Sequence, residues 1–263
     1  MFIACQIRDG DLDNFFAHEN HPFPPSLSSD GSLNTSNKLG LLECLETLAP
    51  SSDTEPNVDM IIIDGAAAVH MLNPGSSSTF SDYATKVFLP YIKCQLQKCK
   101  RVDVVWDDYI PNYLKTSARL SRGTGTRRRV EETTHLPGNW QTFLRLDENK
   151  TELFRFLAPQ ILKIESQKQV ISTIGKDVLM LNRQNTSDIA PCNHEEADVR
   201  IFLHLADGIC GGSKTALIRT TDTDVVVIAV AVAAKLKNEQ LWIWFGTGKT
   251  QRFIPAHEIA NKK

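Results

Sequence analysis

Apolar residues follow two different spacings along this chain, and the spacing separates strands from helices. Short uninterrupted apolar runs bounded by turn residues are typical of buried strands, whereas apolar positions that recur every three or four residues are typical of helices. The runs that predict strands are 58–63, 102–106, 169–174, 178–181, 215–220, 240–245 and 251–254. The segments that predict helices are 41–48, 65–72, 80–99, 140–163, 195–206 and 225–236.

The two kinds of element alternate along most of the chain, which predicts an α/β fold. Alternation favours a mainly parallel central sheet with helices on both faces, a three-layer α/β/α arrangement. Two pairs of strands, around Gly175 and around Gly246, have no helix between them and predict hairpins. Pro90 and Pro159 should each kink or break the helix that contains them, and Gly208 should end the helix before it.

The N-terminal region differs in composition from the rest of the chain. Proline, serine and glycine cluster in residues 21–31, which is typical of turns and loops. We therefore expect residues 1–57 to form a loosely ordered extension and residues 58–263 to form the α/β domain. The chain has 263 residues, of which 41% are hydrophobic, and this is enough to bury a sizeable core.

Charge and targeting signals narrow the functional classes only slightly. The formal net charge is -2, so no overall charge field points to a class of partner, and the information lies in the local distribution of charge. No apolar stretch approaches the about 18–20 residues of a membrane span, and the first residues lack the pattern of a signal peptide. We expect an intracellular protein, nuclear or cytoplasmic, that is neither secreted nor membrane-bound and keeps its six scattered cysteines reduced.

Acidic residues mark the ends of several apolar runs, and they are the most informative chemical feature of the sequence. Four of them follow predicted strands and two open a predicted helix: Asp64, Asp107, Asp222 and Asp224, with Glu196 and Asp198. The carboxyl ends of parallel strands meet at one edge of the sheet, so these side chains should gather there. Carboxylates that lie close together repel one another. Magnesium or manganese ions, which prefer oxygen ligands, would relieve that repulsion.

A basic stretch follows the second of these aspartates. No acid occurs between Asp108 and Glu131, but six cations do: Lys115, Arg119, Arg122, Arg127, Arg128 and Arg129. Such a stretch, with its glycine-containing loop, predicts a phosphate-facing helical arch at about 109–140 that binds nucleic acid. Runs of charge are also commonly solvated surface, and this alternative stays open.

Four of these segments, in this order, resemble the flap-endonuclease (XPG-like) branch of the PIN-like nucleases. They are Ile61-Ile62-Ile63-Asp64-Gly65, Val104-Val105-Trp106-Asp107 with the downstream Leu114-Lys115, Glu195-Glu196-Ala197-Asp198, and Thr221-Asp222-Thr223-Asp224-Val225. The resemblance covers about residues 58–250. It implies a PIN-like domain and a phosphodiesterase that uses two magnesium or manganese ions, about 3.5–4 Å apart.

The resemblance also assigns roles to individual residues. All six acids would hold the metal ions, and Lys115 and Arg122 would contact the scissile phosphate on one helical face. The remaining basic residues would bind a flapped, branched or single-stranded nucleic acid, DNA more than RNA. The chain departs from the family in ending before a further helical element and metal aspartate, which leaves two alternatives: it is a fragment of a larger member, or it has lost part of the site. A catalytically inactive binding or scaffold protein is therefore a second interpretation.

Structural explanations compete with the functional one at several positions. Asn193 and Glu196 have the spacing of a capping box, and Asp222 could merely cap the helix predicted after it. The segment 245–250 ends like a P-loop but lacks its first glycine, because Ile243 occupies that position, so we expect no nucleotide cofactor. A phosphatase of the Asp-x-Asp type is disfavoured because Gly65 and Ala66 follow Asp64.

Overall fold

The computed structural model describes residues 28–29, 32–33, 38–108, 125–183, 185–194, 197–236 and 240–262. The chain divides into two compact units, Met1–Leu41 and Leu42–Lys263. In the first unit, β1 (Ser28–Ser29) pairs antiparallel with β2 (Ser32–Leu33). Everything below concerns the second unit, which contains the sheet.

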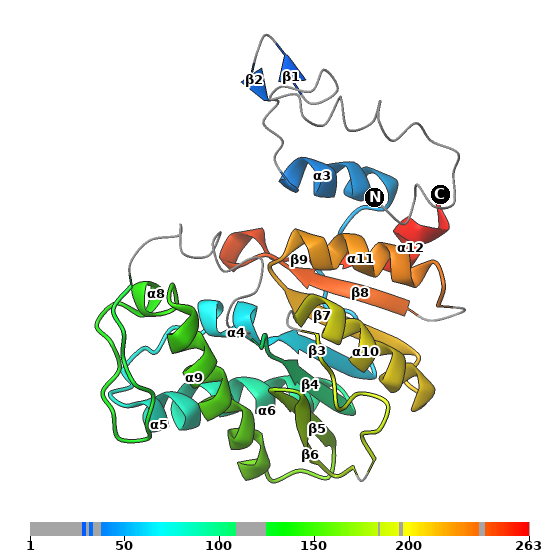
Figure 1. The fold of residues 1–263 in the computed structure, drawn as a ribbon. Coiled ribbons are helices and arrows are strands. Elements are labelled where there is room, and N and C mark those ends of the chain that lie inside the picture. The colour runs from blue at the N-terminus through cyan, green and yellow to red at the C-terminus, as the bar shows by residue number, and fades with distance from the viewer. Residues whose placement is uncertain are drawn as a thin grey trace, which may run out of the picture. The chain divides into compact units, whose positions relative to one another are not determined.

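The second unit is built around a mainly parallel sheet, as the alternation of elements predicts (Figure 1). Its strands are β3 (Met60–Asp64), β4 (Arg101–Val105), β5 (Gln169–Ile174), β6 (Asp177–Leu181), β7 (Thr215–Thr220), β8 (Gln240–Phe245) and β9 (Arg252–Pro255). Their order across the sheet is β6-β5-β4-β3-β7-β8-β9. The five inner strands are parallel, and the two predicted hairpins add β6 and β9 antiparallel at the edges.

Helices cover both faces of the sheet and form two cores. One core includes residues of α4 (Gly65–Met71), α5 (Phe80–Tyr83), η1 (Ala84–Phe88), α6 (Leu89–Lys98), α8 (Trp140–Phe143), α9 (Asp147–Leu157) and η2 (Ala158–Lys163). The other includes residues of α3 (Lys38–Leu48), α10 (Ala197–Cys210), α11 (Thr223–Ala233) and α12 (Ala256–Asn261). Strand β3 serves both, because Ile61 and Ile63 pack into the first core and Met60 and Ile62 into the second. The three-layer α/β/α arrangement is therefore confirmed.

Tertiary packing alters some predicted boundaries. A π-helical turn, η1, precedes Pro90, and the 3-10 helix η2 contains Pro159, so both prolines disturb their helices as predicted. Gly208 lies inside α10 rather than at its end, and that prediction was wrong. A Cβ at Gly208 would lie 2.2 Å from Met60 Sδ, so this glycine lets the helix approach β3 closely.

The expected basic arch is described only in its second half. Residues 109–124 lie outside the described part of the chain, whereas residues 125–139 contain turns and extended segments and no helix. Asn149, on α9, fixes this segment by donating to Thr126 O and accepting from Arg128 N, at 2.9 and 3.1 Å. A helical arch extending to residue 140 is therefore a wrong prediction for residues 125–139, because their backbone hydrogen bonds go to α9 and to neighbouring loops.

Gly65 is required for the packing of the first core beside β4. A Cβ at this position would lie 2.1 Å from Cε3 of Trp106, whose ring stacks on Phe154 with centroids 4.7 Å apart. We expect Gly65→Ala to lower the free energy of unfolding by about 1–3 kcal/mol, because overpacking must displace a buried ring. Chemical denaturation measures this effect. Gly138→Ala is the matched control, since a Cβ there meets open space; equal stabilities for the two variants would contradict the prediction.

A search of the described residues for membrane spans found no helix with both the length and the apolar character needed to cross a bilayer.

Candidate functional site

The order of the strands places a topological switch point at β3. The chain passes from β3 to β4 on one side and later returns to β7 on the other, so the strand order reverses at β3. In open α/β sheets, ligands bind at such a reversal, outside the carboxyl ends of the strands. Asp64 is the last residue of β3, Asp107 lies two residues beyond β4, and Asp222 two residues beyond β7. Three of the predicted acids therefore lie at this edge.

Asp64 is held in a fixed orientation between β3 and β7. It is the N-cap of α4, and its Oδ1 accepts a hydrogen bond from Ala67 N at 3.0 Å. Its Oδ2 accepts from the Thr220 hydroxyl at 2.9 Å, and the same hydroxyl oxygen accepts from Asp222 N at 3.0 Å. Thr220 thus connects the buried Asp64 carboxylate to the backbone of Asp222.

Asp222 caps a helix, as one of the competing explanations predicted. It is the N-cap of α11, which begins at Thr223, and its Oδ1 accepts from Asp224 N at 2.9 Å. The side chains of Asp222 and Asp224 are both exposed. Capping and cation binding are compatible, because the hydrogen bond from Asp224 N engages only one of the two Asp222 carboxylate oxygens.

Asp107 connects the end of β4 to the start of α10. Its Oδ1 accepts a hydrogen bond from Ala197 N, the first residue of α10, at 2.8 Å. Asp198 follows in the first turn of that helix and is partly buried. Glu196 and the predicted capping-box arrangement around it lie outside the described residues, as do Lys115, Arg119 and Arg122.

The carboxylates influence one another electrostatically. Burial, the negative charge of Asp107 and, to a smaller extent, the charge of Asp222 together raise the pKa of Asp64 to about 7. Hydrogen bonds from Ala67 and Thr220 oppose the increase. An acid with such a pKa is only partly ionised at neutral pH, a nearby positive charge would favour its ionised form, and an oxygen-rich donor set suits a hard divalent cation.

The predicted acids that the structure describes lie at one edge of the sheet but do not surround a common position at which one ion could bind. Within the described ranges, no three His, Cys, Asp or Glu side chains lie close enough together to hold one ion. Magnesium keeps several water ligands, so a site of this kind would rely on one or two direct carboxylates and on water-mediated contacts from the others.

The described arginines of the basic stretch have intramolecular partners. Arg127 forms an ion pair with Glu152, and Arg129 forms one with Glu131 at 3.0 Å. Arg128 donates to His135 O at 2.9 Å. Exposed ion pairs are weak and exchange readily, so these contacts leave the predicted binding of phosphate untested.

Two residues of this edge were missed by the sequence reasoning. Thr220 has the dual hydrogen-bonding role given above, and its position directly before the acidic segment was the available signal. Arg219 is buried within β7 and donates to Trp244 O and Gly246 O at 2.8 and 2.6 Å. An arginine inside an apolar strand was the signal that the sequence offered for Arg219. In the structure this side chain connects the carboxyl ends of β7 and β8.

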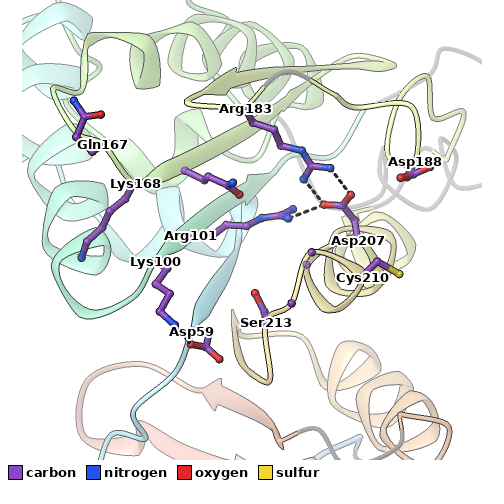
Figure 2. Close-up of a pocket in the computed structure, with 14 residues that line it drawn as sticks. Asp59, Lys100, Arg101, Gln167, Lys168, Arg183, Asp188, Asp207, Cys210 and Ser213 are labelled. Carbon is purple, nitrogen blue, oxygen red and sulfur yellow. Dashed lines mark hydrogen bonds and ion pairs between the residues drawn. The ribbon is translucent and has the colours of Figure 1, made fainter.

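A cavity of about 730 Å³ lies at the opposite, amino-terminal edge of the sheet (Figure 2). Its buried charges are paired with each other: Asp207 accepts from Arg101 at 2.6 Å and from Arg183 at 2.6 Å, and Arg101 also donates to Asp103 at 2.7 Å. Asp59 at its rim pairs with Lys100 at 2.8 Å. Because these groups compensate each other, we place the candidate functional site at the carboxyl edge.

The strand order and the helices on both faces define an α/β protein of the doubly wound type, with carboxylates at its switch point. A scan against protein-family models and a search of curated proteins each found no match.

Proposed function

We propose that this protein is a divalent-metal-dependent nuclease that hydrolyses phosphodiester bonds, and that it belongs to the XPG-like branch of the PIN-like nucleases. The observation that carries the proposal is the placement of Asp64, Asp107 and Asp222 at the carboxyl ends of the neighbouring strands β3, β4 and β7, where the charges of Asp107 and Asp222 act on Asp64. These are the positions at which the resemblance places metal ligands.

Each acid would contribute in a different way. Asp64, fixed by Ala67 and Thr220, would provide the central ligand, and Asp107 would provide a second from the neighbouring strand. Asp222 and Asp224 would hold a second ion from the exposed rim, with Asp198 and Glu196 completing the set. Magnesium or manganese bound there would supply an activated water and neutralise charge on the phosphate.

The substrate class follows from the same resemblance. Flapped, branched or single-stranded nucleic acid, DNA more than RNA, would be bound by the basic stretch. Lys115 and Arg122 would act at the scissile phosphate, and Arg119, Arg127, Arg128 and Arg129 would bind the flanking strand. A nuclear or cytoplasmic location is part of this proposal.

Cleavage of a labelled 5′-flap and of a single-stranded oligonucleotide tests the proposal. We expect cleavage in manganese or magnesium, none in chelator, and a loss of at least about a hundredfold in Asp222→Asn. Asparagine keeps the helix cap while it removes the charge, so the variant should stay folded. Full activity in Asp222→Asn, or cleavage that survives chelation in the wild type, would contradict the site.

A catalytically inactive nucleic-acid-binding or scaffold protein is the second candidate. It is favoured by the absence of three converging ligands among the described residues. The affinity of such a protein for nucleic acid would fall steeply with salt concentration and would not depend on a divalent metal. Thermal unfolding separates the candidates, because ions that bind the native site must raise the midpoint temperature of the wild type more than that of Asp222→Asn.

A further inference from the structure

A narrow cleft opens beside Asp107 on the side away from β3. Asp107 and Asp108 line one wall, Thr173 and Gly175 at the end of β5 line another, and Thr151 and Arg155 on α9 line the third. The space inside it that the centre of a water-sized group can occupy is about 10 Å³, room for about one oxygen-sized group. A base or a sugar is far too large for this space, whereas one oxygen of a phosphate at the mouth is not.

The walls of the cleft are fixed by buried contacts. Trp106 N donates to Thr173 Oγ1 at 2.8 Å, and Trp106 Nε1 donates to Ser172 Oγ at 2.9 Å. The buried guanidinium of Arg200 donates to Gly175 O at 2.6 Å and so holds the β5–β6 turn. The cleft therefore keeps its shape without a ligand, which lowers the cost of binding one.

Arg155 is the cation of this cleft. Its side chain is exposed, and it forms no hydrogen bond or ion pair with any other residue in the described part of the chain. Most exposed arginines are simply solvated, but this one lines the same cleft as an acid of the candidate metal site. Arginine binds phosphate oxygens through a fork of donors, a geometry that lysine cannot reproduce.

We propose that this cleft receives a backbone phosphate of the nucleic-acid strand, with Arg155 as its ligand, beside Asp107 of the candidate carboxylate site. The inference rests on the proposed nuclease function and deepens it. Asp107 and Asp108 alone would repel the phosphate, so Arg155 and a cation at the carboxylates would hold it from two sides. The contact between Arg155 and this phosphate would align the nucleic-acid strand so that a neighbouring phosphodiester reaches the candidate carboxylate site.

Binding of a fluorescent single-stranded DNA tests the assignment. In this binding assay calcium replaces magnesium, because calcium also prefers oxygen ligands. Cleavage of the same DNA is monitored in parallel on a gel. We expect Arg155→Gln to weaken binding about tenfold and to reduce the slope of log K against log salt by about 0.7, the value for one phosphate contact on a single strand. Lys163→Gln, which removes an exposed cation of η2, should change neither quantity.

A set of DNA probes, each with one phosphate replaced by a neutral methylphosphonate, shows which phosphate Arg155 contacts. The wild type should lose affinity at one position at which Arg155→Gln loses none, because the variant already lacks the contact. A wild type that cleaves in manganese while Arg155→Gln keeps wild-type affinity and slope would overturn this inference alone. A wild type that neither binds nor cleaves nucleic acid would overturn the proposed function and this inference with it.

Discussion

Asp64→Asn should abolish metal-dependent cleavage and, in the presence of chelator, should make the folded protein more stable than the wild type above pH 7. Both effects have one cause. The Asp64 carboxylate is buried and lies near the charges of Asp107 and Asp222, and together these raise its pKa to about 7. Without a cation its ionised form opposes folding, and with a cation the same charge becomes the ligand.

The sign of the pH dependence follows from the folded and unfolded pKa values. In the unfolded chain Asp64 titrates near its ordinary value of about 3.9, and in the folded chain near 7. The native state therefore binds the extra proton between these values, and the wild type loses stability as pH rises from about 4 to about 7. Because one pKa unit corresponds to about 1.4 kcal/mol, the loss approaches about 4 kcal/mol at pH 8.

Denaturant unfolding of wild type and Asp64→Asn, at pH 4 and pH 8 in chelator, measures this difference. The two proteins should be similarly stable at pH 4, and the variant should be more stable by about 2–4 kcal/mol at pH 8. Manganese at pH 8 should stabilise the wild type and not the variant. A variant that is less stable at pH 8, or one that retains cleavage, would contradict the role of Asp64.

Asp59→Asn is the control of opposite sign. A hydrogen bond from Lys100, with help from backbone donors, lowers the pKa of Asp59 to about 2. The stability that Asp59 contributes is present above its unfolded pKa of about 3.9 and is lost as pH falls through 2. Asp59→Asn should therefore be less stable than the wild type at pH 8 and should cleave normally, because Asp59 lies at the opposite edge of the sheet.

Asp103→Asn should be the most destabilising single substitution we consider. The Asp103 side chain is fully buried and accepts from Arg101 Nε at 2.7 Å and from Arg101 Nη2 at 2.5 Å. His204 Nδ1 lies 2.7 Å from the same carboxylate. Asparagine keeps the shape but removes one of the two carboxylate charges, those of Asp103 and Asp207, that compensate the buried Arg101 guanidinium. Breaking a buried pair from one side costs about 3–5 kcal/mol.

Guanidinium unfolding at pH 7 measures this cost, and two further variants define its origin. Asp188→Asn, which changes an exposed acid lining the cavity that Arg101 and Asp207 also line, should change the free energy of unfolding by less than about 0.5 kcal/mol. The double variant Arg101→Met with Asp103→Leu should be less destabilised than Asp103→Asn, because it removes the Arg101 guanidinium together with its partner Asp103, and Asp207 keeps its ion pair with Arg183. An Asp103→Asn protein within about 1 kcal/mol of the wild type would show that the buried network contributes little.

The sequence by itself determined the elements and the fold class. Strands such as 215–220 and the hairpins at Gly175 and Gly246 depend on short-range steric preference and on the burial of neighbouring apolar side chains, which a local pattern records. The placement of Asp64, Asp107 and Asp222 directly after strands was readable for the same reason. Parallel strands then carried these three acids to one edge of the sheet.

Only the tertiary structure decided which groups touch. Thr220 reaches Asp64 because β7 pairs with β3, and Asp107 meets Ala197, 90 residues away, because α10 packs across β4. Gly208 continues a helix instead of ending it because Met60 lies against it. Arg155 and Asp107 share a cleft because α9 packs beside the ends of β4 and β5. Contacts of this kind depend on the complementary shapes of distant segments, and no local spacing encodes those shapes.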